Sequence, residues 1–354
     1  MSRYLSKKYA DLVPYVPGEQ PRDRAYIKLN TNESPFPPSR RAQKAAKAAA
    51  KRLALYPDPT MKALREAFAR ELGIAPECCL AVNGSDEILN FAFAAFCDED
   101  TPAVYADITY GFYGVFADLY RLPRRVIPLC EDLSINPTAY YNAGGTVFIA
   151  NPNAPTGIAL SRAEIEEIVK NNPDNIVVVD EAYVDFGAES AVSLIGKYDN
   201  LLVTQTFSKS RSMAGARLGF GIACPDLIRD LDAIKYSTNP YNVNSMTAAV
   251  GIGTLSDPFY TEHNCKEIMK TRAYVLDELR AMGFSATASV TNFVFATHPK
   301  ISGEDYYSAL RARGILVRHF TGERICEYNR ITIGSRAEME KFLSATKAIL
   351  EEKQ

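Results

Sequence analysis

Residues 201–224 read LLVTQTFSKSRSMAGARLGFGIAC, in which two apolar runs enclose a segment of serine, alanine and glycine. The runs LLV at 201–203 and LGFGIAC at 218–224 are apolar, a pattern typical of strands that are covered on both faces of a sheet. A single lysine, Lys209, follows the first run, and Arg217 directly precedes the second. Ligands of open parallel sheets bind beyond the carboxyl ends of the strands, so Lys209 is expected at a ligand site.

Outward from this segment, strand-like and helix-like stretches alternate along the chain. Further apolar strands are predicted at 103–107, 146–153 and 175–183, with helical patterns between them. Such alternation predicts an α/β domain built on a largely parallel sheet. After about residue 245 the pattern changes to long helical stretches and short strands, which predicts a smaller α+β domain.

The chain is expected to divide into three parts. Residues 1–35 are rich in proline and charge and predict an extended N-terminal arm that packs on the small domain. Residues 36–245 are expected to form the large, ligand-binding domain, and residues 246–354 the small C-terminal domain. A length of 354 residues suits two domains better than one hydrophobic core.

The composition is typical of a soluble globular protein, with 47% hydrophobic and 23% charged residues. The net charge of −2, without a long block of one sign, argues against a nucleic-acid partner. No apolar run reaches the length of a membrane span, and the first residues, MSRYLSKKYADLV, lack the apolar core of a signal peptide. Seven cysteines without a CxxC pair indicate reduced thiols and a cytoplasmic location. The three histidines do not cluster with cysteines, so no metal site is expected.

Polar and aromatic residues follow the predicted strands or open the next helix. Each has an ordinary explanation when taken alone: a loop lysine, a helix cap, a packed tyrosine or a surface arginine. Their occurrence in one order favours a shared site, because the carboxyl ends of parallel strands meet at one edge of a sheet. The candidates are Gly84, Ser85 and Asp86 in NGSDE, Thr109 and Tyr110, Asn151 and Asn153, Asp180 and Tyr183, and Ser208, Lys209 and Arg217.

Together, the motifs NPNAPTG, DEAY and TFSKS…AGARLGF resemble those of the pyridoxal-phosphate-dependent aminotransferases of the aspartate aminotransferase fold. The resemblance covers essentially the whole chain. Finer features resemble the histidinol-phosphate aminotransferases, namely VPY, LNTNESPFPPS, YPDP, NGSDE, GILVR and NRITIG. This resemblance implies the type I fold of pyridoxal-phosphate transferases, with a mostly parallel sheet in the large domain and a smaller α+β domain. It also implies transamination of L-histidinol phosphate with 2-oxoglutarate in histidine biosynthesis.

The resemblance further implies roles around pyridoxal 5′-phosphate. Lys209 would bond the cofactor aldehyde, and it can attack only as a neutral amine. Asp180 would keep the pyridine nitrogen protonated, and Tyr183 would donate to the ring O3′ oxygen. The cofactor phosphate would bind at the start of a helix and beside Arg217, because a helix N-terminus and a guanidinium both suit an anion. The implied cofactor contacts are Gly84, Ser85, Asp86, Tyr110, Asn153, Thr206, Ser208, Arg217 and Tyr56.

Substrate contacts are implied by position in the same family. Arg330 in NRITIG matches the arginine that binds the substrate carboxylate, and Arg318 in GILVR matches one directed at the substrate phosphate. Tyr56 would reach the active site of the partner subunit in a homodimer. The implied substrate-binding set is Tyr15, Asn32, Tyr56, Asn292, Arg318 and Arg330.

One position departs from the family pattern. The residue before Pro-Thr-Gly is often an asparagine that bonds O3′, whereas here it is Ala154, preceded by Asn153. We expect Asn153 to reach the ring through a shifted turn. The alternative is that Tyr183 makes the O3′ contact largely alone.

Other functions fit part of the pattern. An aromatic amino-acid aminotransferase on the same scaffold would bind a phenyl ring where histidinol phosphate has its imidazole. A threonine-phosphate decarboxylase would align the carboxylate, rather than the Cα–H bond, with the cofactor ring. A non-catalytic binding protein of the same fold is disfavoured because Lys209, Asp180, Tyr183 and Arg217 occur together. A nicotinamide-dependent dehydrogenase is disfavoured because no G-x-G-x-x-G follows the early strands.

Overall fold

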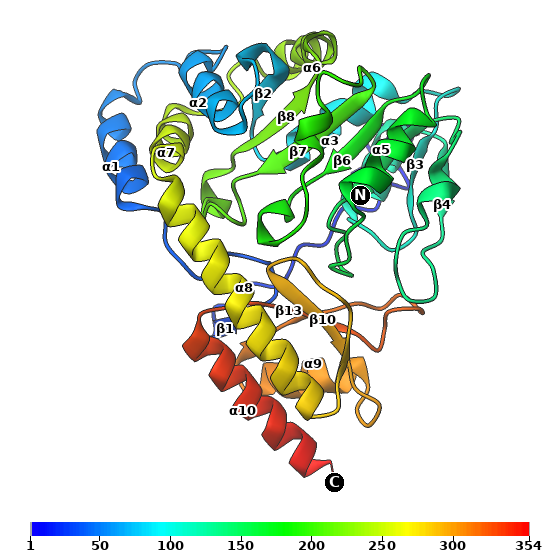
Figure 1. Cartoon of the computed structure of the whole chain (residues 1–354), viewed down its shortest axis with the longest axis vertical. Coiled ribbons are helices and arrows are strands. Elements are labelled where there is room, and N and C mark those ends of the chain that lie inside the picture. The colour runs from blue at the N-terminus through cyan, green and yellow to red at the C-terminus, as the bar shows by residue number, and fades with distance from the viewer. Residues whose placement is uncertain (1, 354) are drawn as a thin grey trace.

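The computed structural model describes residues 2–353 and has a large domain, which contains a sheet, and a smaller domain (Figure 1). Helix α8 (Pro258–Ala281) leads from the large domain into the smaller one (Figure 1). Met1 and Gln354, the ends of the expected arm and small domain, lie outside the described residues. The seven-stranded sheet of the large domain has the order β2-β8-β7-β6-β5-β3-β4. Its strands are β2 (Cys79–Val82), β3 (Ala103–Ala106), β4 (Arg124–Ile127), β5 (Thr146–Ala150), β6 (Val177–Asp180), β7 (Leu201–Thr206) and β8 (Gly219–Ala223).

The sheet is mostly parallel, as predicted. Only β8 differs, because it runs antiparallel to both of its neighbours, β2 and β7. This reversal places the amino end of β8 beside the carboxyl end of β7, so that Thr206 faces Gly219. Lys209 and Arg217 lie in the connection between these two strands, and both therefore emerge at the same edge of the sheet.

Each face of the sheet buries a hydrophobic core. Successive side chains of a strand point to opposite faces, so Val177 and Val179 of β6 belong to one core and Val178 to the other. The first core includes side chains from α2 (Lys62–Leu72) and α5 (Arg162–Lys170). The second includes side chains from α3 (Ser85–Phe96), α4 (Phe112–Tyr120) and α6 (Pro225–Thr238). The continuous apolar runs are thus strands covered on both sides.

Helix α7 (Ser245–Leu255) belongs to the large domain. It packs against α1 (Arg40–Ala49), where a Cβ at Gly253 would lie 2.8 Å from the Cα of Ala42. Val250 and Leu255 of α7 also pack on the first core of the sheet. The domain boundary expected at residue 245 therefore falls after α7, because this helix finds its apolar partners in the large domain.

The small domain packs an antiparallel sheet, of order β12-β13-β10-β9, with three helices. The end of the N-terminal arm joins this domain, because β1 (Ile27–Lys28) pairs in parallel with β11 (Ile315–Leu316). Earlier arm residues contact the large domain instead, where Arg121 donates to the carbonyls of Lys7 and Lys8 and Tyr15 stacks on Phe112. Among the described residues, no helix is both long and apolar enough to span a membrane. The remaining elements are β9 (Ser285–Ala286), β10 (Phe293–Thr297), β12 (Arg318–His319), β13 (Asn329–Thr332), α9 (Gly303–Ala312) and α10 (Arg336–Glu352).

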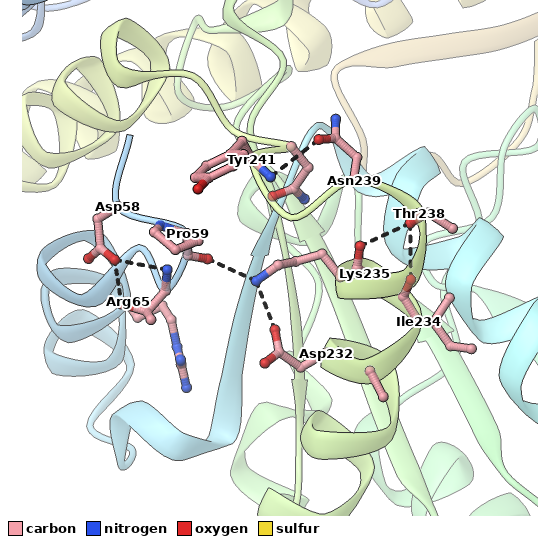
Figure 2. Close-up of polar contacts among 12 residues, drawn as sticks. Asp58, Pro59, Arg65, Asp232, Ile234, Lys235, Thr238, Asn239 and Tyr241 are labelled. Carbon is pink, nitrogen blue, oxygen red and sulfur yellow. Dashed lines mark hydrogen bonds and ion pairs between the residues drawn. The ribbon is translucent and has the colours of Figure 1, made fainter. Parts of the chain in front are cut away.

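A buried lysine fastens the loop at residues 56–60 to α6. Lys235 is only 2% exposed. Its ammonium group donates to the carbonyl of Pro59 at 2.9 Å and to Asp232 Oδ1 at 2.8 Å (Figure 2). A buried cation is costly unless its hydrogen-bonding groups are paired, so the Lys235 ammonium ties the position of Pro59 to that of the helix.

Replacing Lys235 by methionine should lower the free energy of unfolding by about 1–3 kcal/mol, because Asp232 and the Pro59 carbonyl lose a buried partner while the apolar stem is kept. Denaturant unfolding followed by circular dichroism measures the change. Arg229→Met is the matched control, because Arg229 pairs with Asp226 on the same helix at the same i,i+3 spacing, but with side chains that are 71% and 80% exposed. We expect the control to unfold like the wild type. Equal effects of the two substitutions would contradict the anchoring role.

Candidate active site

A cavity of about 460 Å³ lies at the sheet edge where β7 ends and β8 begins. Segments far apart in the sequence meet there because parallel strands bring their carboxyl ends to one edge. Most of the predicted cofactor contacts line this cavity. These contacts are Ser85, Asp86, Tyr110, Thr206, Ser208 and Arg217, and the cavity is also lined by Lys209, Asp180 and Tyr183.

Lys209 provides the amine of the cavity. The residue is half-buried, and its Nζ donates to the carbonyl of Thr31 at 3.2 Å. The same Nζ lies 5.9 Å from the ring centre of Tyr183. Glu33 lies close enough to Lys209 for the lysine charge to affect its pKa. Burial raises the pKa of Glu33, but hydrogen bonds from Lys28 and Thr31 and the charges of Lys28 and Lys209 leave it below its ordinary value. The amine therefore lies near an ionised carboxylate.

Asp180 is a buried carboxyl at the end of β6. It is 4% exposed and accepts hydrogen bonds from Ala182 N at 3.2 Å and from the Tyr113 hydroxyl at 3.4 Å. No lysine or arginine among residues 2–353 forms an ion pair with it. Burial, followed by the charge of Asp86, raises the pKa of Asp180 to about 7. A ligand that offers a positively charged N–H would stabilise its ionised form, since an opposite charge favours ionisation.

The first turn of α3 and Arg217 form an anion-binding corner. Gly84 precedes the helix with a φ of 81°, and a Cβ at this position would lie 2.6 Å from Arg217 Nη2. Arg217 donates to Asp86 Oδ2 at 3.0 Å and lies 3.5 Å from Ser208 Oγ. Free N–H groups at a helix N-terminus, beside a guanidinium and a hydroxyl, suit a phosphate.

Neighbouring groups support this corner. Thr206 Oγ1 donates to Ser208 Oγ at 2.9 Å. Gly219 lets β8 approach the helix start, because a Cβ there would lie 2.6 Å from Ser85 N. The Tyr110 hydroxyl donates to Asp86 Oδ1 at 2.6 Å. Burial and the charge of Asp86 raise the pKa of Tyr110 well above its usual range, so its phenol keeps the proton.

Two arginines lie directly opposite each other in the small domain. Arg318 of β12 and Arg330 of β13 are cross-strand partners. Arg318 donates to the carbonyls of Val16 at 3.3 Å and Pro17 at 3.5 Å. Arg330 donates to the carbonyl of Asn30 at 3.3 Å, and its buried Nε has no hydrogen-bond partner. Neither guanidinium forms an ion pair with a carboxylate in the described part of the chain. Like charges on facing strand positions destabilise a sheet, so this pair favours an anionic ligand.

Arg330 is near the cavity although it is not part of the cavity wall. Burial lowers the pKa of Arg330 from its usual value, while the phenol groups of Tyr183, Tyr15 and Tyr110 act in the opposite direction. Tyr183 and Tyr110 both line the cavity. Arg330 therefore links the Arg318–Arg330 pair, which favours an anionic ligand, to the cavity that contains Lys209.

The expected reach of Asn153 into the cavity is not observed. Its Nδ2 donates to the Ile108 carbonyl at 3.0 Å and to Thr156 Oγ1 at 3.1 Å, and its Oδ1 accepts from Thr109 Oγ1 at 2.7 Å. The amide is therefore engaged in holding the loop after β3. Ala154, whose side chain has no donor, lines the cavity at this turn.

Two predicted tyrosines also lie outside the cavity wall. Tyr15, on the N-terminal arm, stacks on Phe112 with ring centres 4.3 Å apart. Tyr56 is 82% exposed and stacks on Tyr241 at 4.6 Å. In a single copy of the chain, Tyr56 is thus a surface residue.

The two remaining candidates, Asn32 and Asn292, do not line the cavity but are hydrogen-bonded behind one of its lining residues, Tyr183. Asn32 Nδ2 donates to the Tyr183 hydroxyl at 2.8 Å, and Asn292 Nδ2 donates to the Asn32 carbonyl at 2.9 Å. Sequence reasoning missed Thr31 and Tyr113, which contact Lys209 and Asp180. Two sequence features could have pointed to them. Tyr113 lies three residues after the predicted site residue Tyr110, and Thr31 lies within LNTNES, beside the predicted Asn32.

Comparison with known proteins identifies the family. The family model for aminotransferase class I and II matches residues 24–345. A histidinol-phosphate aminotransferase from Marinomonas sp. (strain MWYL1) is 48% identical over 353 residues, which cover 99% of this chain and 100% of that protein. The protein of the same name from Brachyspira hyodysenteriae is 46% identical over 352 residues, covering 99% of both.

Solved structures show the same fold at lower sequence identity. Histidinol-phosphate aminotransferase from Sinorhizobium meliloti, solved in complex with pyridoxal-5′-phosphate, matches with a TM-score of 0.89 and 22% identity, covering 100% of both chains. An aspartate aminotransferase mutant from Thermus thermophilus matches with a TM-score of 0.82 and 18% identity, covering 98% of this chain and 99% of that one. On the evidence of the family match and these full-length relatives, the chain belongs to the class I and II aminotransferase family.

Proposed function

We propose that the chain is a histidinol-phosphate aminotransferase of histidine biosynthesis, which uses pyridoxal 5′-phosphate to move an amino group from L-histidinol phosphate to 2-oxoglutarate. The observation that carries the proposal is one cavity that combines the amine of Lys209, the buried carboxyl of Asp180 and an anion-binding helix start. Relatives that are 43–48% identical over almost their full length bear this name. A cytoplasmic location, which the seven free cysteines support, is part of the proposal.

The residues of the cavity fit pyridoxal phosphate. Asp180 forms no ion pair with a cation among residues 2–353, and the protonated pyridine nitrogen of the cofactor would provide one. The phosphate would bind the N–H groups of Ser85 and Asp86 together with Ser208 and Arg217. Tyr110 would stack on the ring, and Tyr183 would donate to its O3′ oxygen. Bound there, the cofactor supplies an electron sink for the charge left when the substrate loses its Cα proton.

Lys209 would hold the cofactor covalently and then act as the base. When it is not bonded to the cofactor, Lys209 would be a free amine within the cavity. Its neutral Nζ would accept the Cα proton and later return a proton as the conjugate acid. The carbonyl of Thr31, 3.2 Å from Nζ, would help to direct the side chain.

Arg318 and Arg330 would bind the anionic end of each substrate. Their cross-strand placement concentrates two positive charges that no carboxylate of the described chain neutralises. A phosphate on the amino donor and a second carboxylate on the oxo acid could each fill this role. Planar guanidinium groups suit both anions, because each can donate two parallel hydrogen bonds.

We infer further that the enzyme is a homodimer in which Tyr56 completes the site of the partner subunit. Tyr56 and Tyr241 form an exposed aromatic stack, and the nearby Leu53 and Leu55 are 53% and 71% exposed. Aromatic groups in an exposed apolar patch are typical of protein interfaces. Lys235 of α6 donates to the carbonyl of Pro59 in the loop that carries Tyr56, and this contact fixes the loop relative to the helix.

The function is tested by mixing the cofactor-loaded protein with L-histidinol phosphate and 2-oxoglutarate and measuring glutamate. Arg318→Ala should lower kcat/KM for histidinol phosphate by about 10- to 100-fold, the range expected for a lost hydrogen bond to a charged group. Activity with phenylalanine should fall far less. The control is Arg313→Ala, because this arginine pairs with Glu352 on the surface. Equal losses for both donors would argue against a phosphorylated substrate.

Asp180→Asn should stabilise the cofactor-free protein at neutral and higher pH. The pKa of Asp180 rises from an ordinary 3.8 to about 7 in the folded chain, so the folded state binds the proton more tightly than the unfolded one. The protonated Asp180 therefore contributes fully to the free energy of unfolding below pH 3.8, and this contribution is lost as the pH rises to about 7. The melting-temperature advantage of the variant should therefore grow up to about pH 7 and then level off. An advantage that does not change with pH would contradict the burial of an unpaired carboxyl.

Subunits that carry Tyr56→Phe and Lys209→Ala should complement each other. Lys209→Ala abolishes its own site, and Tyr56→Phe weakens the site of its partner, but a mixed dimer keeps one site with both native residues. Random exchange of subunits should restore about a quarter of wild-type activity, because half of the dimers are mixed and each has one intact site. Refolding or co-expression followed by an activity assay measures this. Activity no higher than the average of the two parents would contradict a shared site.

A further inference from the structure

Asn32 links the N-terminal arm, the small domain and the cavity wall. The residue is 1% exposed and has a φ of 56°, which an asparagine adopts more readily than most residues. Its backbone N–H donates to Thr332 Oγ1 at 2.9 Å, and its carbonyl accepts from Asn292 Nδ2 at 2.9 Å. Its side chain lies between Thr332 and Tyr183. Both the backbone and the amide of Asn32 are therefore held in place.

The hydrogen-bond directions around Asn32 follow from one another. A backbone N–H can only donate, so Thr332 Oγ1 accepts it and is free to give its own hydrogen to Asn32 Oδ1 at 3.0 Å. The amide then turns its Nδ2 toward Tyr183 and donates to the phenol oxygen at 2.8 Å. The Tyr183 hydroxyl is thus an acceptor toward Asn32, and its single hydrogen is available for another partner.

A flipped amide would reverse this result. Thr332 would lose Oδ1 as an acceptor, and Tyr183 would have to donate to the amide oxygen instead of accepting from nitrogen. The T-shaped contact of the Tyr183 ring with Phe293, at 5.2 Å and 89°, also fixes the ring that carries the hydroxyl. Thr332 therefore decides, through Asn32, which way the tyrosine hydrogen points.

Tyr183 has no substitute on the turn where the family places a second donor. The Ala154 side chain has no donor group, and the side-chain amide of Asn153 is engaged by Ile108, Thr156 and Thr109. No hydrogen bond in the described part of the chain uses the Tyr183 hydroxyl as a donor. Of the two positions at which the family places an O3′ donor, Tyr183 is therefore the one that keeps an unengaged side-chain hydrogen in the described part of the chain.

We propose that Asn32 is a positioning residue that holds the Tyr183 hydroxyl as a hydrogen-bond donor toward the cofactor O3′ oxygen, and that it thereby sets how readily the nitrogen joining lysine and cofactor loses its proton. The inference rests on the proposed function. A hydrogen bond donated to the anionic ring oxygen withdraws negative charge from it, so the neighbouring nitrogen holds its proton less tightly. Because Ala154 contributes nothing, this chain places the whole effect on Tyr183.

The charged groups already present around the hydroxyl are left unchanged by the substitutions that test this role of Asn32. Lys209 lies over the Tyr183 ring, Arg330 is close to its phenol, and Glu33 and Asp180 line the same cavity. Among residues 2–353, none of these groups hydrogen-bonds to the Tyr183 oxygen, which accepts from Asn32. Changing Asn32 therefore alters the direct partner of the hydroxyl and leaves the other charges in place.

The test is a pH titration of the visible absorbance of bound pyridoxal phosphate in the full-length protein. Asn32→Asp keeps the shape of the side chain but replaces the donating nitrogen with an acceptor, so Tyr183 must turn its hydrogen toward residue 32. Tyr183→Phe removes the hydrogen altogether. Each substitution should raise the titration midpoint by about one pH unit, the range expected for a hydrogen bond to a charged group.

The double variant Asn32→Asp with Tyr183→Phe separates the effect that passes through the Tyr183 hydroxyl from the direct effect of the added carboxylate. If Asn32 acts through the hydroxyl, Asn32→Asp should raise the midpoint much less in the Tyr183→Phe background than in the wild type. Thr332→Val, which frees the amide to turn, should raise the midpoint in the same direction. Thr332→Ser, which keeps the hydroxyl, should leave it unchanged. Thr332→Val keeps the inference testable if Asn32→Asp does not fold.

Two results would overturn the inference alone. One is a midpoint in both Asn32→Asp and Thr332→Val within about 0.2 pH units of the wild type, well below the shift expected from a lost charged hydrogen bond. The other is an equal shift from Asn32→Asp with and without the tyrosine hydroxyl. A wild-type protein that binds the cofactor without any titrating band would overturn the proposed function together with this inference.

Discussion

Strand β8 runs antiparallel between β2 and β7, and this reversal determines where the charges of the site lie. In a wholly parallel sheet the strand after β7 would begin at the far edge, and Arg217 would be carried away from Lys209. Here the connection turns back at once, so the amine and the guanidinium emerge at the edge where β6 presents Asp180. Gly219 makes the turn compatible with α3, whose first N–H groups would otherwise be pushed away by a Cβ.

Unbalanced charge is the second feature that defines the site. Within the described residues, the buried carboxyl of Asp180 forms no ion pair with a cation, and Arg318 and Arg330 on the neighbouring strands form none with a carboxylate. Such arrangements reduce the stability of the isolated chain, since buried or facing charges are costly without partners. They become favourable when ligands of opposite charge bind. A cofactor with a protonated ring nitrogen and substrates with anionic ends satisfy these requirements.

The segment after β1 connects the two domains at this site. Thr31 contacts Lys209 of the large domain, Asn32 contacts both Thr332 of the small domain and Tyr183 of the large one, and Glu33 lines the cavity. Movement of the small domain would therefore be transmitted to the residues that face the cofactor. This explains why a short segment near the N-terminus, which contributes little to either core, carries several consecutive polar residues.

Much of the site could be predicted from local patterns. Apolar runs identified β5, β6 and β7, and a parallel sheet places the residues that follow such strands at one edge, so Asp180, Tyr183, Lys209 and Ser208 were found together. The family resemblance added roles for these residues that periodicity cannot supply. The domain boundary was less predictable, because α7 could pack on either domain and only its contacts with α1 and the first core assign it to the large one.

The sequence by itself determined the class of fold and the chemical groups at the sheet edge, because both follow from periodicity and from residues next to strand ends. Only the tertiary structure decided which polar groups are already engaged. Asn153 is held by Thr109, Arg318 faces Arg330, and Asn32 directs the hydroxyl of Tyr183. The physical reason is that a hydrogen bond depends on distances of about 3 Å between atoms, and here those atoms belong to segments whose separation along the chain says nothing about their separation in space.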